Sequence, residues 1–174
     1  MLWAFGGWAG AACAENYIDV DVGMVYSDVS ASEPSPIDGD FSSGDVGYHL
    51  GVGAYRNTGD SRWVYGVKLE LQDVVGNSLI SVRAIDVGYK FTRRFTFNGY
   101  LGGARYDLAT PAFGYRLGLG GRYWISDRWA LSAEVSFADS VARDKLFPEE
   151  NPGVGSPDLF FDVTQLSVYL KYKF

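Results

Sequence analysis

The last eight residues, 167–174, read SVYLKYKF and alternate between two kinds of side chain. Val168, Leu170, Tyr172 and Phe174 occupy every second position, with mostly polar residues between them. A period of two is typical of a β-strand, in which successive side chains point to opposite faces. The segment is therefore predicted to be a strand with one apolar face, and the fold depends on what covers that face.

The same alternation recurs along the chain, with turn residues between the segments. The predicted strands are Tyr17–Tyr26, Val46–Tyr55, Arg62–Gln72, Leu79–Phe91, Phe95–Tyr106, Phe113–Ile125, Trp129–Phe137 and about Val163–Phe174. The first half of the fourth strand is out of phase, which indicates a β-bulge. Eight strands of about ten residues each have the length that crosses a bilayer at a tilt.

Short and long connections alternate along the chain. Three tight turns lie at 57–60, 92–94 and 126–128, whereas segments 27–45 and 139–160 are long and rich in Ser, Pro, Gly and acidic residues. Two further connections, 74–78 and 107–112, are of intermediate length. An up-and-down barrel would gather the tight turns at one rim and the longer connections at the other. The sequence thus predicts an all-β protein, an eight-stranded antiparallel up-and-down transmembrane β-barrel.

The two faces of these strands differ in chemistry. The apolar face carries aromatic residues near both strand ends, as expected of the girdles at the two membrane interfaces. The other face combines glycine with charge and is predicted to line the lumen, where unpaired charges would be costly. A paired lumen network is expected among His49, Lys68, Glu70, Asp86, Arg116, Arg122 and Glu134. At the seam between the first and last strands, Asp19 and Asp21 are expected to meet Lys171 and Lys173.

A soluble eight-stranded carrier barrel is the alternative fold, with its apolar face inward around a ligand. Opposite charges on one face of the strands, and the asymmetry of the loops, favour the membrane barrel instead.

The first fourteen residues, MLWAFGGWAGAACA, are uncharged and apolar and then small. They are predicted to be a signal peptide or its remnant, cleaved after Ala14, so that residues 15–174 form the barrel. A buried N-terminal segment is the other interpretation. Cys13 is the single cysteine of the chain, which excludes a disulfide framework.

The last strand resembles the C-terminal signal of bacterial outer-membrane barrels. The resemblance rests on Leu166, Val168, Leu170, Tyr172 and the terminal Phe174. With the eight strands, the chain is similar to the small outer-membrane barrels of the OmpA, OmpX and opacity-protein kind. That resemblance implies recognition by the barrel-insertion machinery, a place in the cell outer membrane, and contact with the lipid bilayer and lipopolysaccharide.

The resemblance also implies a structural, adhesive or resistance role that is carried by exposed loops, through which a surface protein could bind. The loop candidates are Glu33, Asp38, Asp40, Asp45, Phe147 and Phe160. The acidic members could attract divalent cations or basic partners, or could simply keep the rim soluble. The two phenylalanines could be adhesive or could pack on the barrel rim.

Two other functions remain open, a narrow gated channel and a lipopolysaccharide-modifying enzyme. Such an enzyme needs a Ser/His pair or a His/Asp/Ser set near the outer rim. His49 is the only histidine, and it is predicted in mid-strand on the lumen face beside Leu50. We therefore expect no catalytic residue, no cofactor and no metal. The net charge of −6 disfavours a nucleic-acid partner.

Overall fold

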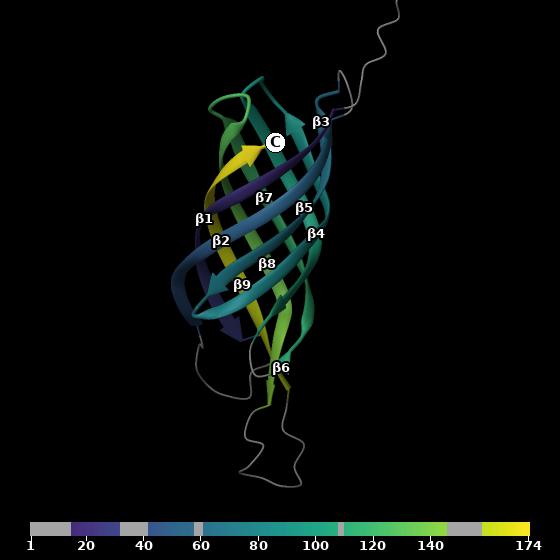
Figure 1. Ribbon diagram of the computed structural model, residues 1–174. Helices are drawn as coiled ribbons and strands as arrows, with labels where there is room; N and C mark the ends of the chain where they lie inside the picture. Colours follow the sequence, from purple (N-terminus) through teal and green to yellow (C-terminus); the bar gives the residue numbers. More distant parts are fainter. Residues whose placement is uncertain (1–14, 32–41, 58–60, 108–109, 146–157) are drawn as a thin grey trace, which may run out of the picture.

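The computed structural model describes residues 15–31, 42–57, 61–107, 110–145 and 158–174. These residues form a single antiparallel sheet (Figure 1). The strands are β1 (Glu15–Ala31), β2 (Ser42–Asn57), β3 (Trp63–Val74), β4 (Asn77–Lys90), β5 (Phe95–Tyr106), β6 (Thr110–Pro111), β7 (Phe113–Trp124), β8 (Trp129–Lys145) and β9 (Asp158–Lys173). The two-residue β6 pairs only with β8, and the other eight strands make the barrel. No helix in these ranges is long and apolar enough to cross a membrane.

The barrel closes because β9 pairs with both β8 and β1, so that the eight strands form a continuous cylinder. Along the seam, Asp19 lies opposite Lys173 and Asp21 lies opposite Lys171. The amide of Phe174 donates a hydrogen bond of 2.9 Å to the carbonyl of Ile18, so the last residue is held against β1. The predicted eight-stranded up-and-down barrel is confirmed.

The two rims differ as the connection lengths indicate. The turns before β3, β5 and β8 lie at the end where the C-terminus is marked in Figure 1, which we call the short-turn rim. The opposite end, the long-loop rim, also contains one tight turn between β3 and β4. There Val75 and Gly76 both have positive φ, 49° and 76°. Two such residues match the right-handed twist of a hairpin, and glycine adopts this conformation without strain.

One bulge in β4, at Ala84 and Ile85, changes the phase of the sheet. Against β3 the register shifts between Gly66 and Lys68, and against β5 it shifts between Arg83 and Ile85. Ala84 and Ile85 both face outward, so Arg83 turns into the lumen. The bulge predicted in this strand is therefore present, and it changes which residues line the interior.

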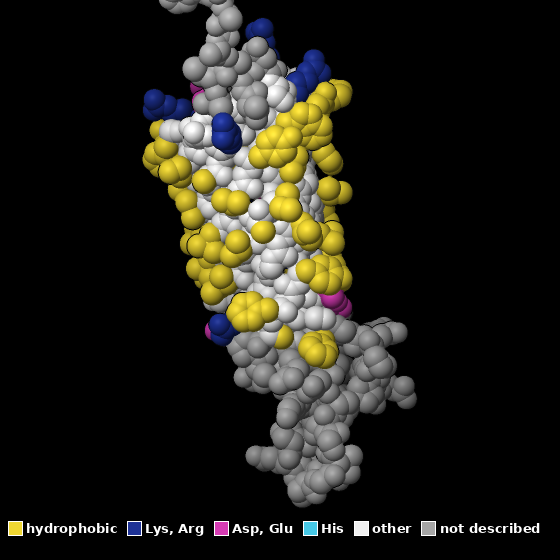
Figure 2. Space-filling model, turned by 90° about the vertical axis from the view of Figure 1, so that its right-hand side faces the viewer, with side chains coloured by type: hydrophobic (Ala, Val, Ile, Leu, Met, Phe, Trp, Pro, Cys, Tyr) yellow, Lys and Arg dark blue, Asp and Glu magenta, His cyan; other side chains and the backbone are white. Residues whose placement is uncertain are grey.

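The outer wall is apolar over the height of the barrel (Figure 2). Side chains such as Val22, Leu69 and Leu119 are exposed at every second position, while the positions between them are buried. Contact of such a wall with water would be unfavourable. In a bilayer, a closed barrel pairs its backbone hydrogen-bonding groups between strands, and lipid covers its apolar wall. The apolar face therefore points outward to lipid, as predicted for a membrane barrel and not for a soluble carrier barrel.

Four strands are longer than the others and lie side by side. β8, β9, β1 and β2 contain 17, 16, 17 and 16 residues, whereas β3, β5 and β7 contain 12 each. Their additional residues lie at the long-loop rim (Figure 1). At the usual rise and tilt, four or five extra residues extend the sheet by about 10 Å. This extension, which we call the projecting sheet, carries one side of the barrel beyond the apolar belt at the long-loop rim.

Candidate functional site

The middle of the lumen holds equal numbers of buried acidic and basic side chains. Among the described residues the acids are Asp19, Asp21, Glu70, Asp86 and Glu134, and the bases are Lys68, Arg83, Arg116, Arg122 and Lys171. Because the two signs balance, the lumen carries no net formal charge when His49 is neutral. A balanced, hydrogen-bonded set avoids most of the cost of an isolated buried charge.

Glu70 on β3 is the acceptor at the centre of this network. Its Oε1 atom lies 2.5 Å from Nη2 of Arg83 and 2.9 Å from Nζ of Lys68. Its Oε2 atom lies 3.0 Å from Nη1 of Arg116 and accepts the hydroxyl of Ser81 at 3.1 Å. One carboxylate thus ties together residues from β3, β4 and β7.

Arg83 bridges this centre to the far wall, and sequence reasoning missed it. Its two terminal nitrogens donate to the two oxygens of Glu134 at 3.1 and 2.5 Å, a fork-like arrangement, and Nη1 lies 3.4 Å from Asp86. The guanidinium also stacks 3.6 Å from the centroid of the Tyr100 ring. The signal that could have found Arg83 is the phase change in β4, since a bulge there brings an apparently outward position inside.

His49 is enclosed by polar partners on both ring nitrogens. Nε2 lies 2.8 Å from Oδ1 of Asp21, and Nδ1 lies 2.7 Å from the amide nitrogen of Gln72. If Gln72 donates to Nδ1, the proton resides on Nε2 and is donated to Asp21. The ring is fully buried and stacks on Tyr169 with centroids 4.6 Å apart. A side chain so enclosed is placed to hold neighbouring strands together.

The seam pairs differ in part from the prediction. Lys171 lies 2.8 Å from Asp19 and 3.5 Å from Asp21, both within the lumen. Lys173, although opposite Asp19 in the register, instead lies 2.5 Å from Glu15. The reason is depth, because Lys173 is at the mouth of the barrel and its long side chain reaches the exposed carboxylate there. Lys173 and Asp19 therefore meet across the seam in the backbone register, as expected, but the ion pair of Lys173 is with Glu15.

The short-turn end of the lumen is lined by aromatic rings. Tyr17 and Tyr55 stack with centroids 5.5 Å apart, and the hydroxyl of Tyr55 donates to Asp86 at 3.0 Å. Arg122 lies over the Tyr55 ring at 5.4 Å and near Trp124 at 5.9 Å. Arg122 is thus held by cation–π contacts deeper than the mouth.

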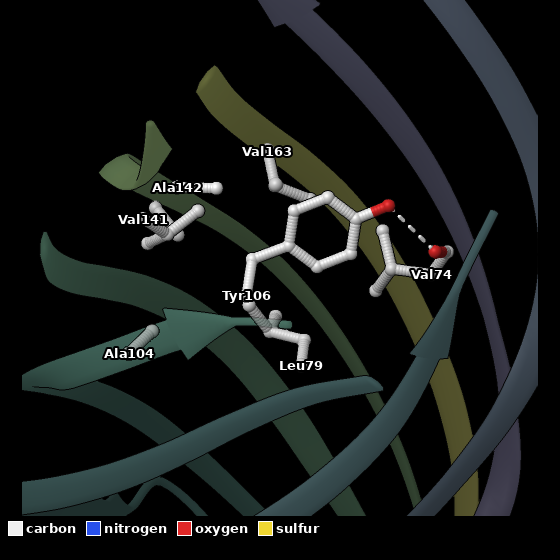
Figure 3. Close-up of a cluster of buried hydrophobic side chains, with 8 residues drawn as sticks. Val74, Leu79, Ala104, Tyr106, Val141, Ala142 and Val163 are labelled. Carbon is white, nitrogen blue, oxygen red and sulfur yellow. Dashed lines mark hydrogen bonds between the residues drawn. The ribbon is translucent and has the colours of Figure 1, made fainter. Parts of the chain in front are cut away.

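An apolar plug fills the lumen at the long-loop end (Figure 3). Its buried members are Val74, Leu79, Ala104, Tyr106, Ala138, Val141, Ala142 and Val163. Tyr106 brings one polar side-chain group into the plug. This hydroxyl donates to the carbonyl of Val74 at 2.9 Å. This layer was not predicted, and together with the charged layer it fills the lumen with buried side chains.

The loop candidates fall into two groups. Asp45 and Phe160 are not in loops: Asp45 belongs to β2 opposite Ser27, and Phe160 belongs to β9 opposite Arg143. Both are exposed, and both lie in the projecting sheet because its strands continue past the predicted ends. The remaining candidates lie outside the described residues; they are Glu33, Asp38, Asp40 and Phe147.

The predicted insertion-signal residues share the outer face of β9 and its end. They are Leu166, Val168, Leu170, Tyr172 and Phe174. Tyr172 packs between Trp129, 4.8 Å away by ring centroids, and Phe174, 4.9 Å away. These rings form part of the aromatic girdle at the short-turn rim.

Comparison with known proteins gives similarity of structure only. No protein-family profile and no curated sequence matches the chain. Neisserial surface protein A has a TM-score of 0.56 at 16% identity, over 93% of this chain and 99% of that one. Ail, the attachment invasion locus protein of Yersinia pestis, crystallised with the heparin analogue sucrose octasulfate, has a TM-score of 0.55 at 11% identity, over 92% and 99%. OprG, an outer-membrane protein from Pseudomonas aeruginosa, has a TM-score of 0.52 at 16% identity, over 92% and 96%.

These three structures cover nearly the whole chain, and all three are small barrels of the same architecture. At such low identity the likeness concerns the fold. The apolar wall and the neutral, charge-paired lumen agree with that fold. The chain therefore has the fold of the small eight-stranded barrels of bacterial outer membranes, with a wall that spans a bilayer.

Proposed function

We propose that the protein is a non-enzymatic outer-membrane protein that presents a rigid, acidic binding surface at its long-loop rim. The observation that carries the proposal is the projecting sheet, which rises above a lumen that is closed by side chains. A surface built on paired strands is held more rigidly than one carried by loops alone.

The packing of the lumen supports a binding role over a channel. The charged layer joins opposite walls through Glu70, Arg83 and Glu134, and the apolar plug lies above it. An ion would have to break several buried ion pairs and then cross an apolar layer without water contact. A steady conductance is therefore not expected.

The charge of the long-loop end indicates the chemistry of a partner. Its aspartates in the described ranges are Asp28, Asp45, Asp73, Asp107, Asp139, Asp144, Asp158 and Asp162, and its bases there are Arg105, Arg143 and Lys145. Segments 32–41 and 146–157 add Asp and Glu and contain no Lys or Arg. Ail was crystallised with a heparin analogue, which is anionic. An acidic rim disfavours such a ligand, so we assign a basic protein surface as the partner.

The test compares binding of a basic protein, such as lysozyme, and of heparin to the folded barrel at low and physiological salt. We expect the basic protein to bind with a strong salt dependence and heparin not to bind. The variant Asp28→Asn/Asp45→Asn/Asp107→Asn should weaken binding. Asp127→Asn at the opposite rim is the matched control and should not.

Conductance in planar bilayers provides the second arm. A steady current from the wild-type protein would contradict the closed lumen and favour a channel. Equal loss of binding in the control variant would show that net charge, and not the long-loop rim, attracts the basic protein.

A further inference from the structure

The three tight turns of the short-turn rim repeat one arrangement. Their sequences are SRW at 61–63, TRRF at 92–95 and SDRW at 126–129. In each, the Ser or Thr hydroxyl accepts the amide of the following aromatic residue, at 3.1, 2.9 and 3.1 Å. Each turn therefore places an exposed arginine immediately before an aromatic residue that opens the next strand.

A tyrosine on the neighbouring strand completes each arrangement. The register sets Trp63 opposite Tyr89, Phe95 opposite Tyr123, and Trp129 opposite Tyr172; these pairs lie at the same level of the girdle. In two of the three, the arginine is held by the tyrosine. Nη1 of Arg62 donates to the hydroxyl of Tyr89 at 3.4 Å, and Nη1 of Arg128 donates to that of Tyr172 at 3.3 Å.

The tryptophans pack against the same tyrosines, with ring centroids 4.9 Å apart for Trp63 and Tyr89 and 4.8 Å apart for Trp129 and Tyr172. We call these constellations the two Arg–Trp–Tyr sites. In the closed sheet, two strands separate the β3–β4 pair from the β8–β9 pair in either direction. The two sites therefore lie on opposite sides of the barrel.

The rim around them is basic. Its described Lys and Arg residues are Arg56, Arg62, Lys90, Arg93, Arg94, Arg128 and Lys173, and its described acids are Glu15 and Asp127. Figure 2 shows Lys and Arg side chains gathered directly above the apolar belt at this end. Since the whole chain has a net charge of −6, the positive charge is concentrated where the wall leaves the hydrocarbon.

We propose that the two Arg–Trp–Tyr sites bind the phosphate of anionic phospholipids in the leaflet that the short-turn rim faces. A guanidinium offers two parallel donors to a phosphate, and here one nitrogen is already steadied by a tyrosine hydroxyl. The tryptophan beneath it lies at the depth of the headgroup and glycerol, where amphipathic rings are preferred. The inference rests on the membrane placement of the barrel and does not depend on the partner at the long-loop rim.

A groove on the outer wall supports a lipid occupant at this end. It has a volume of about 740 Å³, and its lining includes Ile18, Tyr65, Val67 and Phe174, with Arg56 at its rim. The lining is apolar with one exposed guanidinium, which matches an acyl chain below a phosphate. The same rim thus combines cationic groups with apolar wall in three places.

Tryptophan quenching by brominated lipids tests the proposal, because Trp63 and Trp129 lie within the sites. The folded barrel is placed in bilayers that contain brominated phosphatidylglycerol or brominated phosphatidylcholine, and the relative lipid affinity is measured. We expect the wild type to prefer phosphatidylglycerol. Arg62→Gln/Arg128→Gln should reduce the preference about fivefold at each site. Arg62→Lys/Arg128→Lys should keep part of the preference for phosphatidylglycerol, since the positive charge remains but the two parallel donors of the guanidinium are lost.

Arg105→Gln is the matched control, because Arg105 is an exposed arginine near the Phe113 ring at the opposite rim. It should leave the preference unchanged, and a gel shift on boiling verifies that each variant is folded. An unchanged preference in Arg62→Gln/Arg128→Gln, or an equal loss in Arg105→Gln, would overturn the assignment. Loss of the preference on adding inorganic phosphate at constant ionic strength would show that the sites take a free ion, and the lipid assignment would fail.

Discussion

Replacing Arg83 by methionine tests whether the lumen network stabilises the barrel. The change removes the forked contact to Glu134 and the 2.5 Å contact to Glu70, and it leaves five buried acids facing four bases. Breaking a buried ion pair from one side costs about 3–5 kcal/mol, because the remaining charge loses its compensation. Glu70 keeps Lys68 and Arg116, and Glu134 keeps Asn98, so we expect about 3 kcal/mol.

The free energy of unfolding is measured by urea titration of the barrel in phospholipid vesicles, followed by tryptophan fluorescence. Arg83→Met/Glu134→Gln restores the charge balance and should recover about 1–2 kcal/mol relative to Arg83→Met, as coupling between contacting residues predicts. Arg105→Met is the matched control. Its side chain is 44% exposed and lies 3.7 Å from Asp107, so the loss should be no more than about 1 kcal/mol.

Two results would contradict a stabilising role for the Arg83 ion pairs. One is a loss in Arg83→Met no larger than that in Arg105→Met, which would mean that water or lipid headgroups reach the lumen and screen the charges. The other is a double variant less stable than Arg83→Met alone, which would mean that Glu134 stabilises the barrel through partners other than Arg83.

Three further predictions concern other parts of the molecule. Gly102→Ala should destabilise the barrel by about 1–3 kcal/mol in the same urea assay, because the added Cβ would lie 1.9 Å from the carbonyl oxygen of Val82. At the short-turn rim, outside the apolar belt, the hydrogen bond from Lys173 lowers the pKa of Glu15. The contribution of Glu15 to the free energy of unfolding is therefore present above its unfolded-state pKa and is lost as the pH falls through its folded-state pKa. Across that pH range the wild type should be more stable to unfolding than Glu15→Gln by at most about 0.5 kcal/mol, and the difference should disappear in acid. A difference that does not change with pH would contradict this prediction. N-terminal sequencing of protein from an outer-membrane fraction should begin after Ala14, and a retained residue 1–14 segment would contradict the predicted signal peptide.

The alternation of side chains was sufficient to predict the strands and their two faces. Because period two is a local property of each strand, the apolar wall follows from the sequence without knowledge of neighbours. The alternation of short and long connections likewise predicted up-and-down order and the two rims. Charged residues such as Lys68, Glu70 and Glu134 could be placed in the lumen for the same reason.

The barrel, its lipid-facing wall and the polarity of its lumen can therefore be derived from the amino-acid sequence alone. The three-dimensional structure was needed to show which charges meet: a bulge turns Arg83 inward, and the depth of Lys173 in the barrel mouth directs it to Glu15. It also revealed the apolar plug around Tyr106, since that layer breaks the rule of a polar lumen. The difference arises because the face on which a side chain lies depends on the phase of one strand, whereas its ion-pair partner depends on the register and bulges of several strands together.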